Sequence, residues 1–135
     1  MKPICGCGFL LVFITVISLF SGCRSGNGVQ DISPAEAQKF IQDNITNTDF
    51  LILDVRTPGE FSSGHLHNAT NVDYNSNDFE AMVDKMDKNK TYLVYCLGGN
   101  RSSSAASTMK ARGFKSVKNM SGGISAWSQQ NLPLE

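Results

Sequence analysis

Apolar residues follow two different patterns along the chain, one typical of helices and one typical of buried strands. Continuous apolar runs at residues 50–53 and 91–95 are typical of strands that are buried on both faces of a sheet. After Ser33-Pro34-Ala35-Glu36, apolar residues recur at helical spacing, and in this tetrapeptide the serine and the glutamate can form a capping box. Two shorter strands are expected at 71–74 and 116–119. The helices are expected from Ser33, at 58–63, from Asp78, over 102–112 and from Gly122 or Gly123.

Strands and helices therefore alternate from residue 33 to the end of the chain. This order predicts an α/β fold with a mostly parallel central sheet of about five strands, right-handed crossovers and helices on both faces. In such sheets, ligands bind beyond the carboxyl ends of the strands. We therefore expect functional side chains where the two buried strands end, at Asp54 and Arg56 and at Cys96.

The first residues have the pattern of a secretory signal. Residues 9–20 are strongly apolar, follow Lys2 and end in Ser21-Gly22-Cys23. These last three residues resemble the lipobox of bacterial lipoproteins, where a small pair precedes a lipidated cysteine, although Phe20 stands where that pattern usually has leucine. We expect a signal peptide at 1–22, a lipidated Cys23 with a flexible tether at 23–28 and one domain at 29–135. The product would be exported to the periplasm or cell surface and attached to the membrane by lipid alone; simple secretion is the alternative.

Composition narrows the class of protein. The chain has 135 residues with 12 basic and 12 acidic side chains, and no basic cluster is visible in the sequence. This balance argues against a nucleic-acid partner, and we expect a monomer. Of the four cysteines, Cys5 and Cys7 would leave with the signal peptide and Cys23 would carry lipid. Cys96 would then be the only free thiol, either buried and inert or present for its chemistry.

The loop after Cys96 has the composition of an anion cradle. It reads Leu97-Gly98-Gly99-Asn100-Arg101-Ser102 and leads from a buried strand into a helix. Backbone N–H groups of such a loop and the positive end of the helix converge on one point, and Arg101 adds further donors. A thiol in this position should ionise readily. The loop therefore predicts a nucleophilic thiolate that faces an anionic substrate; the alternative is an inert cysteine before an ordinary loop.

At this point the sequence resembles the rhodanese-like sulfurtransferase family in its single-domain form, over roughly residues 29–135. The resemblance lies in three segments, in order: Leu53-Asp54-Val55-Arg56 with Glu60-Phe61 and Gly64-His65-Leu66; Cys96 to Arg101; and Gly113-Phe114 with Val117 and Gly122-Gly123-Ile124-Ser125-Ala126-Trp127. One departure is His67-Asn68-Ala69, where the family usually has Pro-Gly-Ala.

The resemblance implies ping-pong sulfur transfer through a persulfide on Cys96, from a small anionic donor such as thiosulfate to cyanide or a thiol, without metal or organic cofactor. Four residues separate Cys96 from Arg101, whereas phosphatases and arsenate reductases of the same fold have five. A phosphatase or arsenate reductase is therefore the weaker alternative. A persulfide carrier or binding module with little turnover is the other.

The remaining candidate residues have supporting roles by the same resemblance. Asp54 and Arg56 are expected to orient the cysteine loop and to pair with neighbours such as Glu60. His65 is expected to satisfy hydrogen bonds inside the fold, with a general-base role as the alternative. His65 and His67 could form a metal pair, but no carboxylate or cysteine has suitable ligand spacing in the sequence, so no metal site is expected.

Overall fold

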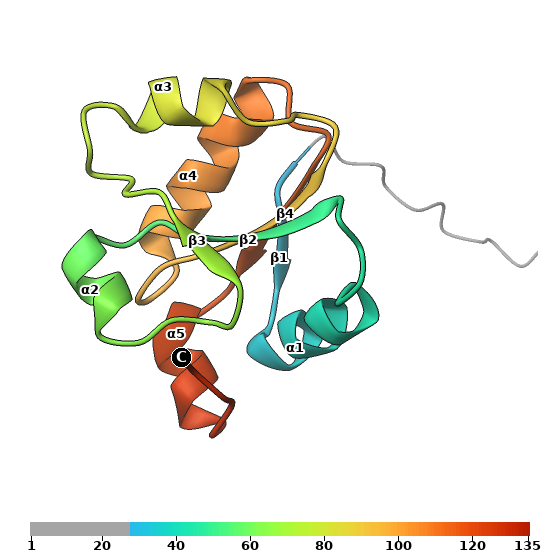
Figure 1. Ribbon diagram of the computed structural model, residues 1–135, viewed down its shortest axis with the longest axis vertical. Helices are drawn as coiled ribbons and strands as arrows, with labels where there is room; N and C mark the ends of the chain where they lie inside the picture. The colour runs from blue at the N-terminus through green and yellow to red at the C-terminus, as the bar shows by residue number, and fades with distance from the viewer. Residues whose placement is uncertain (1–27) are drawn as a thin grey trace, which may run out of the picture.

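Five parallel strands form one sheet in the computed structural model, which describes residues 28–135 (Figure 1). The strands are β1 (Gln30–Ile32), β2 (Phe50–Asp54), β3 (Ala69–Asn71), β4 (Thr91–Tyr95) and β5 (Ser116–Met120). They lie in the order β1-β5-β4-β2-β3, and each adjacent pair is parallel. The predicted α/β class and parallel sheet are therefore confirmed. The predicted signal peptide, Cys23 and nearly all of the tether lie outside the described residues.

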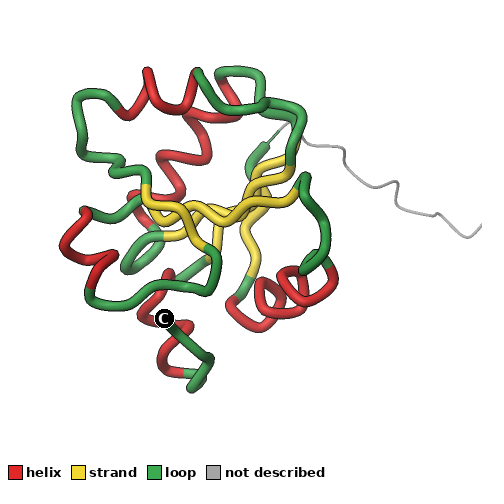
Figure 2. Tube along the Cα trace, viewed as in Figure 1, coloured by secondary structure: helices red, strands yellow, loops and turns green. Residues whose placement is uncertain are grey.

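Helices cover both faces of the sheet (Figure 2). They are α1 (Pro34–Asp43), α2 (Pro58–Ser62), α3 (Phe79–Asp84), α4 (Asn100–Ala111) and α5 (Gly123–Gln129). One core cluster joins Val83 of α3 and Met109 of α4 to Leu53 of β2, and the other joins Ala37 of α1 and Trp127 of α5 to Ile52 on the opposite face of the same strand. Within residues 28–135, no helix is both long and apolar enough to cross a bilayer.

Several local predictions are confirmed, and others need correction. The Ser33–Glu36 capping box is present at the start of α1, and the apolar runs became β2 and β4. β1 was not predicted, because a three-residue strand with a single buried residue leaves no apolar run. β3 occupies Ala69–Asn71 instead of residues 71–74, pairing Ile52 with Ala69 and Asp54 with Asn71. α4 begins at Asn100, two residues before the predicted start, because Gly99 turns the chain with a φ of 105° and no polar side chain caps the helix.

The topology places the carboxyl ends of β2 and β4 side by side. Asp54, the last residue of β2, is in register with Tyr95, the last residue of β4. One step further along, the backbone N–H of Val55 donates to the carbonyl oxygen of Tyr95 at 3.0 Å. The two segments singled out in the sequence, around Asp54 and around Cys96, therefore meet at one edge of the sheet, as parallel strands require.

Candidate active site

Cys96 lies between the end of β4 and the start of α4, with its side chain turned into the fold. Only 1% of the residue is exposed to solvent. Its Sγ accepts a hydrogen bond from the backbone N–H of Gly99 at 3.1 Å and one from the hydroxyl of Ser102 at 3.4 Å. The loop thus curls around the sulfur and directs donors at it, which is the arrangement that stabilises a negative charge on that atom.

The environment of Cys96 favours the thiolate. Burial raises the pKa of the thiol, because it removes water from the charged form. Hydrogen bonds from the Ser102 hydroxyl and from the backbone N–H groups of Ser102, Gly99 and Gly98 act in the opposite direction and outweigh burial, so the pKa of Cys96 lies below that of an ordinary thiol. A lowered thiol pKa is the property that distinguishes a reactive cysteine from an inert buried one.

Backbone N–H groups at the start of α5 donate to carbonyl oxygens of the cysteine loop. The N–H of Ile124 donates to the carbonyl oxygen of Cys96 at 2.8 Å, and the N–H of Ser125 donates to that of Leu97 at 3.0 Å. Gly123 has a φ of 57°. A methyl group at this position would lie 2.5 Å from the Leu97 carbonyl oxygen and would also overlap the carbonyl oxygen of Cys96. Only glycine permits this close approach. Sequence reasoning missed this role, although the pair Gly122-Gly123 directly before a helix was a visible signal.

Arg101 is held by a carboxylate. Its two terminal nitrogens donate to the two carboxylate oxygens of Glu60 at 2.8 Å each. The hydrogen bonds from Arg101 are the main reason that the pKa of Glu60 falls to about 2; burial opposes this shift, and bonds from Thr57 add to it. Glu60 is therefore ionised at any ordinary pH. The prediction that Glu60 pairs with Asp54 and Arg56 was wrong: its partner is Arg101, 41 residues away in sequence.

Asp54 and Arg56 instead form a buried pair with each other. Arg56 donates to both carboxylate oxygens of Asp54, with its shortest contact at 2.6 Å, and also to the carbonyl oxygen of Gly64 at 2.7 Å. The side chain of Asn71, which the sequence did not single out, donates to the carbonyl oxygens of both residues. The pair therefore fixes the chain after β2, and the Arg56 guanidinium lies 5.8 Å from the ring centroid of Tyr95, the residue before Cys96.

The two histidines lie near the C-terminus. His65 Nδ1 is 3.0 Å from the carbonyl oxygen of Phe61, and its ring stacks on the Phe61 ring. These contacts agree with the predicted structural role of His65. A carboxylate does lie beside His67: Glu135 contacts its Nδ1 and is 3.9 Å from His65 Nε2. Over residues 28–135, no group of three or more potential ligands is arranged to hold a metal ion.

The other predicted site residues divide by exposure. Ser102 is fully buried against the sulfur, whereas Leu97, Gly98 and Asn100 are exposed beside it. Leu97 is 48% exposed, which is high for a large apolar side chain next to a buried thiol. The exposed residues thus form the open side of the loop, from which a substrate would approach.

Comparison with known proteins matches this arrangement to a family. The model of the rhodanese-like domain matches residues 33–130, a range that includes Glu60, Cys96 and Gly123. Thiosulfate sulfurtransferase 16, chloroplastic, of Arabidopsis thaliana is 37% identical over 91 residues, covering 60% of this chain and 76% of that protein. A sulfurtransferase of Allochromatium vinosum is 26% identical over 103 residues, covering 76% of this chain and 94% of that protein. Among solved structures, the polysulfide-sulfur transferase homodimer of Wolinella succinogenes is similar with a TM-score of 0.65 at 28% identity, covering 79% and 78% of the two chains.

Proposed function

The chain belongs to the rhodanese-like family, and we propose that it is a sulfurtransferase whose Cys96 carries sulfane sulfur as a persulfide. The single observation that carries this proposal is the set of donors around the Cys96 sulfur. The N–H of Gly99 and the hydroxyl of Ser102 point at the buried Sγ, and the pKa of the thiol is lowered. The sulfurtransferase names of the relatives support the same reaction class.

In the first half-reaction, the Cys96 thiolate attacks the outer sulfur of a donor. A sulfur–sulfur bond forms between Sγ and that sulfur, and the bond from the outer sulfur to the rest of the donor breaks. The departing group takes the electron pair; from thiosulfate it leaves as sulfite. The N–H groups that now face Sγ would stabilise the negative charge of the persulfide.

In the second half-reaction, a thiophilic acceptor attacks the outer sulfur of the persulfide. The bond to Sγ breaks, its electron pair returns to Cys96 and the thiolate is regenerated. Cyanide would leave as thiocyanate, and a thiol would leave as a persulfide. The lowered pKa of Cys96 favours the ionised nucleophile, so the two steps do not depend on a dedicated base beside the sulfur.

Arg101 and Glu60 together decide how well an anionic donor binds. The carboxylate of Glu60 occupies one edge of the guanidinium and offsets its charge, leaving three of the five N–H groups of Arg101 for a substrate. We expect thiosulfate to bind through those groups, more weakly than at an unpaired arginine. Donors that bring less charge, such as thiol persulfides, lose less by this pairing.

Activity assays on one preparation separate the candidate reactions. We expect thiocyanate formation from thiosulfate and cyanide, and none after Cys96→Ser, which preserves the shape of the side chain. Hydrolysis of p-nitrophenyl phosphate should be absent from both proteins. Phosphate release that depends on Cys96, without thiocyanate formation, would support the phosphatase alternative and refute sulfur transfer. A persulfide that forms in one turnover but is not passed to cyanide or thiols would support the carrier alternative.

We also propose that the protein is exported and anchored through Cys23, as a monomer. The support is the apolar run at 9–20 followed by Ser21-Gly22-Cys23. A diacylated cysteine supplies two buried chains, which is the number needed for stable anchoring. The processed protein should partition into a detergent phase, and Cys23→Ala should block both processing and partition. A processed protein that stays in the aqueous phase would show simple secretion instead.

A further inference from the structure

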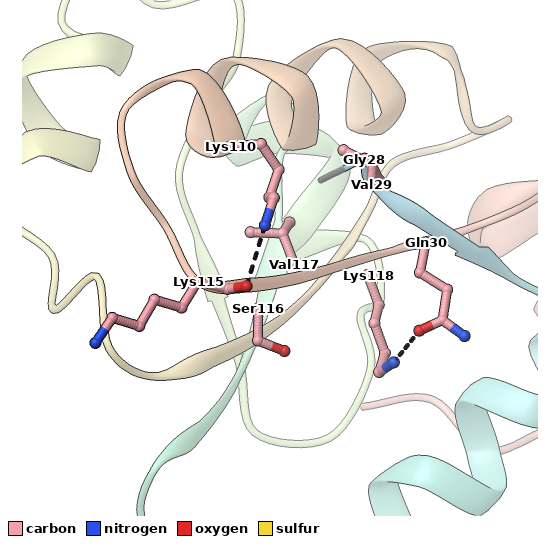
Figure 3. Close-up of a pocket in the computed structure, with 8 residues that line it drawn as sticks. All are labelled: Gly28, Val29, Gln30, Lys110, Lys115, Ser116, Val117 and Lys118. Atoms are coloured by element: carbon pink, nitrogen blue, oxygen red, sulfur yellow. Dashed lines mark hydrogen bonds between the residues drawn. The ribbon is translucent and has the colours of Figure 1, made fainter. Parts of the chain in front are cut away.

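A basic groove lies at the end of the sheet opposite to Cys96. The groove has a volume of about 520 Å³ and is lined by the starts of β1 and β5 and by the end of α4. Three lysines line it, Lys110, Lys115 and Lys118 (Figure 3). Cys96 follows the carboxyl end of β4, which is parallel to β5, so the groove and the reactive sulfur face away from each other.

The charge of these three lysines is not offset by carboxylates. Lys110 donates to the carbonyl oxygen of Lys115 at 3.0 Å, and Lys118 donates to the side-chain oxygen of Gln30, both of which are neutral acceptors. Within residues 28–135, no ion pair includes Lys110, Lys115 or Lys118, and no carboxylate lines the groove. In a chain of zero formal charge, this is a local positive surface with room for anionic groups.

The three lysine ammonium groups are spread apart, so they match an array of anions on a surface better than one small anion. In Figure 3, the three side chains take different directions: Lys115 points away from the groove, Lys110 reaches from α4 to the start of β5, and Lys118 leaves β5 on the side away from α4, where its Nζ is 4.9 Å from the Phe40 ring. A lone phosphate is usually held by donors that converge on one point. Donors that diverge match an array of anions, such as the headgroups of an anionic bilayer.

The N-terminal segment joins the domain at this groove. Gly28, the first described residue, is part of the groove lining. Four residues lie between Cys23 and Gly28, and the five Cα-to-Cα steps from Cys23 to Gly28 span at most about 18 Å. If Cys23 or the apolar run before it enters a membrane, the groove is therefore kept within about two Debye lengths of the bilayer surface.

We propose that the groove lysines dock the domain on anionic phospholipid headgroups, with Cys96 directed away from the bilayer. This inference rests on the proposed membrane attachment but concerns a separate surface. Each lysine near an anionic membrane strengthens binding about fivefold, so the three together contribute about a hundredfold. Docking would fix the orientation of the domain and leave the open side of the cysteine loop accessible to soluble donors and acceptors.

Acylation of lysines in the full-length processed chain tests this orientation. The protein is placed on vesicles of phosphatidylcholine alone, or of phosphatidylcholine mixed with phosphatidylglycerol, and treated with a water-soluble acylating reagent. We expect Lys110, Lys115 and Lys118 to react several-fold more slowly on the anionic vesicles. Lys39 and Lys85, which are exposed and do not line the groove, should react equally on both vesicle types. Equal rates at all five lysines, or slowing at all five, would overturn the proposal.

Variants separate docking from attachment. The anchor contributes equally to both vesicle types, so the ratio of the two partition coefficients isolates the effect of lipid charge. The triple change Lys110→Gln, Lys115→Gln and Lys118→Gln should lower this ratio by up to about a hundredfold. Control changes at Lys39 and Lys85, which do not line the groove, should leave most of this ratio.

Three results from these variants have distinct meanings. Equal losses per lysine in the groove variant and in the control variant would overturn the proposal. A protein that does not bind vesicles of pure phosphatidylcholine would show that the proposed lipid anchor is absent. The docking proposal is then decided by whether the groove variant binds anionic vesicles more weakly than the wild type. Protection of the groove lysines by inorganic phosphate without vesicles would show a free-anion pocket and would also overturn it.

Discussion

Ser102→Ala removes the side-chain donor that reaches the Cys96 sulfur and leaves the backbone donors in place. The Ser102 hydroxyl lies 3.4 Å from Sγ and 3.1 Å from the carbonyl oxygen of Gly99, and it is fully buried. A hydrogen bond to the thiolate lowers the pKa of Cys96, so its removal must raise that pKa. The change therefore tests whether the loop tunes the thiol, and it tests this without altering the nucleophile itself.

The size of the effect follows from the geometry. A hydrogen bond to a charged group contributes about 1.5–3 kcal/mol. The single proton of the hydroxyl is shared between the sulfur and the carbonyl oxygen of Gly99, so the lower end of this energy range applies. A loss of about 1.4 kcal/mol raises the pKa by one unit, which makes the thiolate fraction tenfold smaller at any pH below the pKa. A more basic thiolate is also more nucleophilic, with a Brønsted coefficient of about 0.4–0.5, which recovers about threefold. The net reaction of Cys96 should slow about threefold.

The rate of Cys96 alkylation by iodoacetamide, measured across pH, reports this change directly. The profile of the Ser102→Ala protein should shift to higher pH, with alkylation about threefold slower on the acid side and about threefold faster on the alkaline plateau. Ser104→Ala is the matched control, because Ser104 is an exposed serine in the same helix. A Ser102→Ala profile that superposes on the wild type, or that shifts to lower pH, would refute the argument that this hydroxyl stabilises the thiolate.

Three other substitutions test the rest of the site. Gly123→Ala places a methyl group 2.5 Å from a loop carbonyl oxygen and should destabilise the fold by about 1–3 kcal/mol in thermal unfolding. Gly59→Ala, where the added methyl group meets open space, is the control. Equal melting temperatures of the two variants would argue against the close contact at Gly123. Glu60→Gln keeps a residue that can cap α2 but removes the negative charge that faces Arg101. The KM for thiosulfate should therefore fall several-fold, while the KM for an uncharged persulfide donor stays the same. A parallel change in the two KM values would contradict the argument that Glu60 offsets the charge of Arg101. Asp54→Asn leaves a buried arginine without its carboxylate and should cost about 3–5 kcal/mol in urea unfolding; a loss under 1 kcal/mol would show that the pair is not a structural brace.

Local sequence signals were enough to predict most of the sheet and the place of Cys96 beyond the end of a central strand. The short apolar runs before Asp54 and Cys96 are typical of buried strands, and parallel pairing then brings their ends together. The capping box at Ser33 likewise depends on residues three apart. These features are fixed by neighbouring residues, which is why they can be identified from the sequence alone.

The features that the sequence did not reveal depend on partners far along the chain. Glu60 and Arg101 are 41 residues apart, and Glu60 has a local role in a capping box with Thr57 that gives no hint of a second partner. The hold of α5 on the cysteine loop depends on backbone hydrogen bonds, which carry no side-chain signal apart from the glycine that permits them. The strand β1 owes its place to pairing with β5 and not to its own residues.

The mass of the intact protein after incubation with a sulfane donor tests the central claim most directly. Wild-type protein treated with thiosulfate, or with a thiol persulfide if thiosulfate reacts slowly, should gain one sulfur atom, and subsequent cyanide should remove it with release of thiocyanate. Peptide mapping should place the added sulfur on Cys96, and the Cys96→Ser protein should gain none. Sulfur bound to the Cys96→Ser protein, or a wild-type protein that gains no sulfur from either donor, would contradict the assignment of Cys96 as the persulfide-carrying nucleophile.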